Sequence, residues 1–115
     1  MKRRLPKECV LSCEGGVSLR LYRFKKHTLF GKELVVFSFG KDAGGIEALV
    51  NMTTYTANRF FEALQQQRFF TFVVDTPTIT VNFTHATFHI GEGQSFNVSR
   101  EHLTDALQKL MEYKT

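Results

Sequence analysis

The chain has 115 residues, 43% of them hydrophobic, with 12 Phe, no Trp and a formal net charge of +4. This length fits one domain that folds without disulfides or metals, and no apolar run approaches the roughly 20 residues needed to span a bilayer. We expect no secretion signal, because the basic residues at the start are not followed by a long apolar segment. We therefore expect a single cytoplasmic domain, residues 1–115, with no membrane partner.

Turn residues divide the first half of the chain into four short apolar segments behind a basic arm, residues 1–8. In the second segment Val17, Leu19 and Leu21 alternate with Ser18, Arg20 and Tyr22, which is typical of a strand with one buried face. Strands are expected at residues 9–13, 17–24, 33–39 and 46–51.

An amphipathic helix is predicted next, over residues 53–67, with Thr53 or Thr54 as its N-cap. Its apolar stripe at i, i+3, i+4 and i+7 consists of Ala57, Phe60, Phe61 and Leu64.

The second half repeats this order of elements. Strands are expected at residues 69–75, 78–84, 86–90 and 95–98, and a second helix at residues 99–113, with Ser99 as its N-cap. In the strand 78–84, Ile79, Val81 and Phe83 alternate with small polar residues, so all three are predicted to face the core.

The two halves match in pattern at an offset of 46 residues, which pairs Ala57 with Leu103 and Leu64 with Leu110. This match predicts two pseudo-repeats, residues 9–67 and 69–113. The apolar stripes of the two helices and the apolar faces of the eight strands all have to be covered. The simplest arrangement packs both helices on one face of antiparallel sheets. The predicted fold class is therefore α+β, built from two ββββα units.

A tandem unit of four strands and a helix in one small basic domain resembles the Whirly and Pur-alpha class, to which the positive-cofactor-four coactivators and the mitochondrial guide-RNA-binding proteins are similar. The resemblance is one of topology and extends over residues 9–113. It implies that the outer surface of the sheet binds single-stranded nucleic acid.

Positive charge is concentrated at the start of the chain. Residues 1–32 contain nine Lys and Arg against Glu8 and Glu14, for a net charge of +7, whereas the remaining residues carry a net charge of −3. Such an asymmetry is typical of a surface that faces a polyanion, although it is also found in solubilising basic arms.

Single-stranded nucleic acids are held by cations that contact phosphates and by aromatic rings that stack on bases. The strand 17–24 offers both, and a register break near Tyr22 or Arg23 is expected, because it would turn Arg23 and Lys25 outward and avoid burying their charges. The predicted nucleic-acid-binding residues are Lys2, Arg3, Arg4, Lys7, Arg20, Tyr22, Arg23, Phe24, Lys25, Lys26 and Lys32.

Other chemistry has little support in the sequence. Cys9 and Cys13 are too few for a disulfide framework or a zinc site, and a turn between His85 and His89 is expected to separate their side chains. No nucleophile stands beside a plausible base, so neither an enzyme nor a cofactor is predicted.

Two functions remain open. The first is a protein that binds single-stranded DNA or RNA in transcription, replication or RNA handling, through counterion release and base stacking. The second is a small protein-interaction or regulatory module (viral, plasmid or host-factor binding), whose sheet edges or Phe-rich surface engage a protein partner or a second copy of itself. Because paired edges are a common route to self-association, a homo-oligomer is expected in either case.

Overall fold

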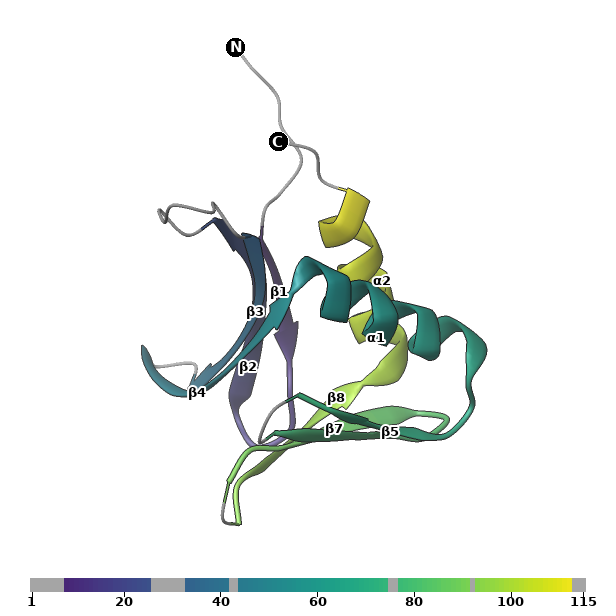
Figure 1. Ribbon diagram of the computed structural model, residues 1–115. Coiled ribbons are helices and arrows are strands. Elements are labelled where there is room, and N and C mark those ends of the chain that lie inside the picture. The colour runs from purple at the N-terminus through teal and green to yellow at the C-terminus, as the bar shows by residue number, and fades with distance from the viewer. Residues whose placement is uncertain (1–7, 26–32, 42–43, 75–76, 92, 113–115) are drawn as a thin grey trace.

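The computed structural model describes residues 8–25, 33–41, 44–74, 77–91 and 93–112. It confirms the α+β class, with two successive units of four strands and a helix (Figure 1). No helix in the described ranges is long and apolar enough to cross a membrane. The first unit contains β1 (Glu8–Ser12), β2 (Val17–Lys25), β3 (Glu33–Lys41), β4 (Gly44–Thr53) and α1 (Thr54–Gln66), and the second contains β5 (Phe70–Val73), β6 (Thr78–Val81), β7 (His85–His89), β8 (Ser95–Ser99) and α2 (Arg100–Glu112).

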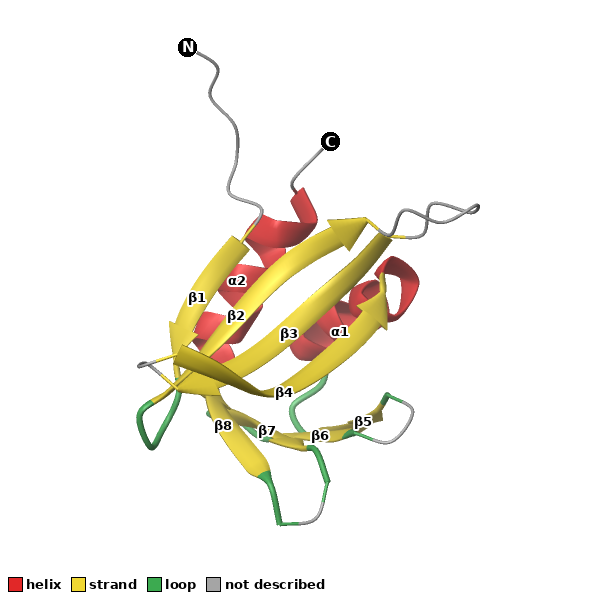
Figure 2. Ribbon diagram, turned by 90° about the vertical axis from the view of Figure 1, so that its left-hand side faces the viewer, coloured by secondary structure: helices red, strands yellow, loops and turns green. Residues whose placement is uncertain are grey.

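Each unit forms its own antiparallel sheet with the strands in chain order. Sheet A consists of β1-β2-β3-β4 and sheet B of β5-β6-β7-β8. The two sheets meet at an angle, and both helices lie inside that angle (Figure 1). Helix α1 packs against β3 and β4, while α2 packs against β1 and β2 of sheet A and β7 and β8 of sheet B. The helices therefore cover the inner faces of the sheets, and the outer face of sheet A lies in front of them in Figure 2.

Both helices begin where the sequence predicts. The hydroxyl oxygen of Thr53 accepts a hydrogen bond from the backbone N–H of Thr56 at 3.1 Å, and that of Ser99 accepts one from His102 at 3.3 Å. Each cap satisfies a donor that the first turn of a helix leaves without an intrahelical partner. Because each cap is also the last residue of a strand, the chain passes from strand to helix without a connecting loop.

Aromatic rings from the two halves pack together in one core. The ring of Phe39 in sheet A stacks on that of Phe96 in sheet B, with centroids 4.4 Å apart. Phe37 and Phe88 also meet across the two sheets, at 5.6 Å, and Phe60 of α1 contacts both rings edge-on. All of these rings belong to a single cluster of buried residues that also includes both helices. The two ββββα units are therefore parts of one packed domain.

Most residues of the two apolar stripes are buried. Ala57 and Leu64 of α1 are buried, as are their counterparts Leu103 and Leu110 in α2. Phe61 is the exception, because it is only half-buried at the margin of the core.

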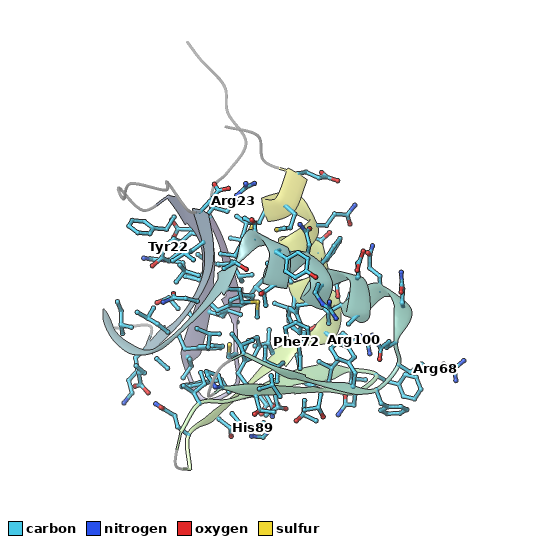
Figure 3. All side chains as sticks on the ribbon, viewed as in Figure 1. Tyr22, Arg23, Arg68, Phe72, His89 and Arg100 are labelled. Atoms are coloured by element: carbon cyan, nitrogen blue, oxygen red, sulfur yellow. The ribbon has the colours of Figure 1, made fainter. Side chains whose placement is uncertain are left out.

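Arg100, the first residue of α2, joins the two units. Its guanidinium donates hydrogen bonds to the carbonyl oxygens of Leu64, Arg68 and Asn82 at 2.7, 2.6 and 2.9 Å, and to that of Gln67. The side chain lies between the end of α1 and sheet B (Figure 3). Three of these carbonyls belong to the end of α1 and the connection to β5, and the fourth belongs to the turn after β6. One side chain therefore holds the two units together.

The strand predicted over residues 78–84 ends earlier, at Val81. The side-chain oxygen of Asn82 accepts hydrogen bonds from the backbone N–H groups of Thr84 and His85, at 2.9 and 2.8 Å. This Asx turn replaces the ladder of the sheet and interrupts its alternation. The prediction that Phe83 faces the core is therefore wrong, and its side chain is 60% exposed.

Candidate nucleic-acid interface

Arg20, Tyr22 and Phe24 lie on the outer face of sheet A, on the side away from the helices. Their strand, β2, pairs with β3 without interruption from Val17 to Lys25, and with β1 without a shift. Side chains alternate along such a strand, so these three project together while Leu19 and Leu21 are buried against the helices. Figure 3 shows Tyr22 on this outer side.

The predicted register break near Tyr22 or Arg23 is wrong. Because β2 remains in register, Arg23 stays on the inner side, next to α2 (Figure 3). Its guanidinium forms an ion pair with Glu33 at 2.5 Å and donates to the carbonyl oxygen of Leu110 at 3.2 Å, and its side chain is only 14% exposed. The carboxylate of Glu33 on the neighbouring strand offsets the desolvation of this partly buried charge. A bulge in β2 is therefore not needed to expose Arg23.

Several predicted contact residues lie outside the described part of the chain: Lys2, Arg3, Arg4, Lys7, Lys26 and Lys32. The strand ends to which their segments attach are described. Glu8, the first residue of β1, pairs with Tyr22 near the end of β2, and Lys25 pairs with Glu33 at the start of β3. Both basic segments therefore join sheet A at the same end, beyond Phe24.

A groove runs across this outer face. It contains two depressions of about 310 and 320 Å³, which share Arg20, Ser38 and Ile46. The first depression extends toward Gly40 and Gly45, where sheet A curls outward at the hairpin between β3 and β4 (Figure 1). The second extends toward Glu8 and Tyr22.

Gly40 makes this curl possible. A Cβ atom at this position would lie 2.6 Å from the backbone oxygen of Gly45, closer than any side chain tolerates. The pairing between β3 and β4 also shifts register at Gly40, which is opposite Ile46. Such irregularities increase the local bend of a sheet, and here the bend closes one end of the groove.

Arg20 occupies the middle of the groove and is 60% exposed. Its Nε atom lies 2.6 Å from a carboxylate oxygen of Glu8 on the adjacent strand. An ion pair this exposed contributes little to stability, so the guanidinium can exchange its partner for another anion at low cost.

Apolar side chains surround these polar groups. Val10, Phe24, Ile46 and Leu49 are all large, exposed hydrophobic residues of sheet A. Phe24 is one of the predicted contact residues, whereas Val10, Ile46 and Leu49 were not predicted from the sequence. Strand parity offers a signal for Leu49, because it alternates with the buried Val50, but the exposure of Ile46 depends on the irregular pairing at Gly40. Among the described residues, the outer face therefore combines the guanidinium of Arg20 and the rings of Tyr22 and Phe24 with an aliphatic margin, and Lys41 lines the depression beside the β3–β4 hairpin.

The outer face of sheet B has a different character. Thr71, Thr80, Thr87 and Asn97 form one row across the four strands, in register with one another. Thr87 donates a hydrogen bond to the side-chain oxygen of Asn97, whose amide donates to Glu14 at 3.2 Å. This small polar face confirms the alternation predicted for Thr78 and Thr80, but its described strands contain no Lys or Arg.

A second exposed aromatic cluster lies at the far end of sheet B. The rings of Phe69 and Phe83 meet at 4.6 Å, both 60% exposed, and the guanidinium of Arg68 lies 5.9 Å from the centroid of Phe83. Figure 3 places Arg68 on the opposite side of the molecule from Tyr22. This cluster is therefore separate from the groove on sheet A.

His85 and His89 are not separated by a turn, which corrects the prediction. Both belong to β7, and their spacing of four residues places them on the same outer face, about 13 Å apart along a strand. Residues so far apart do not share a metal ion. Within the described ranges, no group of three potential ligands is arranged to hold one.

Cys9 and Cys13 are free and half-buried on the inner side of β1 and just beyond it. Four residues of extended chain separate them by about 13 Å, well beyond the 7 Å Cα separation that a disulfide allows. Burial raises the pKa of both thiols, that of Cys13 to about 11. A thiol with a raised pKa is a poor nucleophile at neutral pH, so neither side chain is set up for covalent chemistry.

Comparisons of the chain with protein-family models, curated proteins and solved structures found no match in any of the three.

Proposed function

We propose that the protein binds single-stranded DNA or RNA on the outer face of sheet A, in transcription, replication or RNA handling. The observation that carries the proposal is the unbroken register of β2, which aligns Arg20, Tyr22 and Phe24 on one open surface. A cation between aromatic rings suits a strand whose phosphates need neutralisation and whose bases need stacking partners.

The distribution of charge supports this assignment. Residues 1–7 and 25–32 contain seven Lys and Arg and no Asp or Glu, and the strand ends that carry these segments lie at one end of sheet A. A polyanion that contacts Arg20 and Tyr22 and continues past Phe24 reaches the attachment points of both segments. Release of counterions from its phosphates then supplies a salt-dependent part of the affinity.

The test is a fluorescence anisotropy titration of labelled single-stranded oligonucleotides against a salt series. The double variant Arg20→Ala, Tyr22→Ala removes the central cation and ring. The matched control is Tyr55→Ala, Arg59→Ala, which removes another exposed cation and aromatic ring in mutual contact, on α1. Stacking contributes about 1–3 kcal/mol per base, so the first variant is expected to bind at least about tenfold more weakly, and the control within about twofold of wild type.

Affinity is also expected to fall steeply with salt and to be higher for single strands than for duplex. The absence of binding at low salt, or equal losses in the two double variants, would overturn the proposal.

The exposed apolar residues favour a second candidate, a protein-interaction surface used by another copy of this chain or by another protein. Val10, Phe24, Ile46 and Leu49 give the outer face more apolar surface than phosphate contacts require. If this function holds, an oligomer measured by light scattering survives charge reversal at Arg20 and dissociates with Leu49→Lys. If the protein instead binds nucleic acid, charge reversal at Arg20 should weaken that binding.

A further inference from the structure

The depression beside the β3–β4 hairpin has a shape and chemistry of its own. Its volume of about 310 Å³ is at the lower end of the range for small-molecule sites and is large enough for one planar ring system. Val10 on β1 and Ile46 on β4 line it from the two margins of sheet A, with β2 and β3 between them.

The floor of this depression is polar. Ser38 is directly opposite Arg20 in the pairing of β2 with β3, and it lines both depressions. Ser38 is 8% exposed, and no other polar residue in the described ranges is as deeply buried. A serine hydroxyl both donates and accepts hydrogen bonds, as the edge of a nucleobase requires. Gly40 adds no side chain to the floor, which leaves room above the backbone.

We propose that this depression takes up a single nucleobase, out of the stack of its strand, with aliphatic contacts from Val10 and Ile46 and its polar edge at Ser38. Arg20, at the boundary of the two depressions, then contacts the adjoining phosphate, and the next base stacks on Tyr22. The inference rests on the proposed function and deepens it, because it converts a general affinity for single strands into a preference among bases.

A base fits this site better than an aliphatic side chain of a protein partner. An aliphatic group would fill the space between Val10 and Ile46 but would cover the hydroxyl of Ser38 without bonding to it, which is unfavourable. An unstacked base offers an apolar face and a polar edge together, and single-stranded recognition commonly uses both.

The test compares the affinities of four oligonucleotides of equal length, each with one kind of base, at one salt concentration. For wild type, the dissociation constants of the best and worst oligonucleotides are expected to differ by about 5- to 10-fold, the contribution of about one hydrogen bond. Ser38→Ala is expected to reduce this difference to about twofold or less, mainly by weakening the best oligonucleotide. Ile46→Ala, at an exposed position where folding is not at risk, is expected to weaken the preferred oligonucleotide as well.

The control variant is Thr80→Val, which removes a hydroxyl from the outer face of sheet B and is expected to leave the preference unchanged. Circular dichroism establishes that each variant is folded. If wild type binds all four oligonucleotides equally, or if Ser38→Ala and Ile46→Ala both keep the preference, the base site is overturned while the proposed function stands. If no oligonucleotide binds at low salt, the proposed function itself fails.

Discussion

Arg100 at the start of α2 donates a hydrogen bond to the carbonyl oxygen of Leu64, near the end of α1, at 2.7 Å. The last carbonyls of a helix have no intrahelical partner, and a positive charge beside them is favourable. Helix α1 has no basic residue in its own last turn. Arg100 supplies that charge from the other half of the chain, so the end of one helix is stabilised by the beginning of the other.

Replacing Arg100 is expected to destabilise the whole domain. Arg100→Met keeps much of the apolar stem but removes every hydrogen bond to the carbonyls, so the free energy of unfolding in urea should fall by about 2–4 kcal/mol. Arg100→Lys should recover only part of this loss, because one ammonium group cannot reproduce the planar fork of a guanidinium. Arg59→Met, at an exposed site, serves as the control and should change stability by about 0.5 kcal/mol or less. Equal stabilities of Arg100→Met and Arg59→Met would contradict this role.

Phe83 and Phe88 offer a matched pair of the same residue type. Phe88 is fully buried among other rings, so Phe88→Ala should lower the free energy of unfolding by about 3–5 kcal/mol, because it leaves a cavity. Phe83 is largely exposed, and Phe83→Ala should cost about 1 kcal/mol or less, from its contact with Phe69. Urea denaturation of both variants measures the two losses in the free energy of unfolding. Losses of similar size would contradict the exposed position of Phe83.

This pair also shows where sequence patterns succeed. The positions of both helices could be predicted, because a cap residue and an apolar stripe coincide at Thr53 and again at Ser99. Alternation predicted which face of β2 is buried. The prediction for Phe83 was wrong because the side chain of Asn82 starts a turn. The alternation of apolar and polar residues does not reveal a local hydrogen bond of this kind.

The candidate site could be predicted only in part. Arg20, Tyr22 and Phe24 share a face because parity along a strand is a local property. The position of Arg23 depends on Glu33, ten residues away, and on Leu110 in the last helix. No residue next to Arg23 in the chain indicates that it has a partner on the inner side. The groove was likewise not predictable, because its shape depends on the approach of Gly45 to Gly40.

Gly40→Ala should disturb the groove and the hairpin together. The added methyl group would meet the backbone oxygen of Gly45 at 2.6 Å, and relief of this contact requires the backbone to move. Overpacking of this kind costs about 1–3 kcal/mol. Thermal or urea unfolding measures the cost, with Ser38→Ala as a nearby control that adds no atoms. Unchanged stability in Gly40→Ala would show that the curl of sheet A does not depend on this contact.

Glu8→Gln should strengthen nucleic-acid binding. Glu8 now pairs with Arg20 at 2.6 Å and competes with phosphate for the guanidinium. Because an exposed ion pair contributes at most about 1 kcal/mol, the expected gain in affinity is about two- to fivefold at low salt. Glu62→Gln removes one negative charge from the exposed side of α1 and controls for net charge. Equal gains in both variants would show that the effect is general and does not involve Arg20.

Stability should decline at alkaline pH through the half-buried thiols. Burial, aided by the nearby carboxylate of Glu14, raises the pKa of Cys13 to about 11 from an ordinary value of 9.0. The folded protein therefore retains a proton that the unfolded chain releases, so this stabilisation is complete below about pH 9 and is lost as the pH rises toward about 11. The urea midpoint of Cys13→Ala should fall less between pH 8 and pH 11 than that of wild type. Parallel declines would mean that other groups account for the effect.

The stacking of Phe39 on Phe96, and of Phe37 against Phe88, has a consequence for any shorter form of this chain. A chain that ended at Gln67 would keep sheet A and α1 but would leave the rings of Phe37 and Phe39 facing water on the side where sheet B now lies. Such a half could cover them only by associating with another half. The present chain contains both halves, so folding it is equivalent to an assembly step carried out within one molecule, at a rate that does not depend on protein concentration.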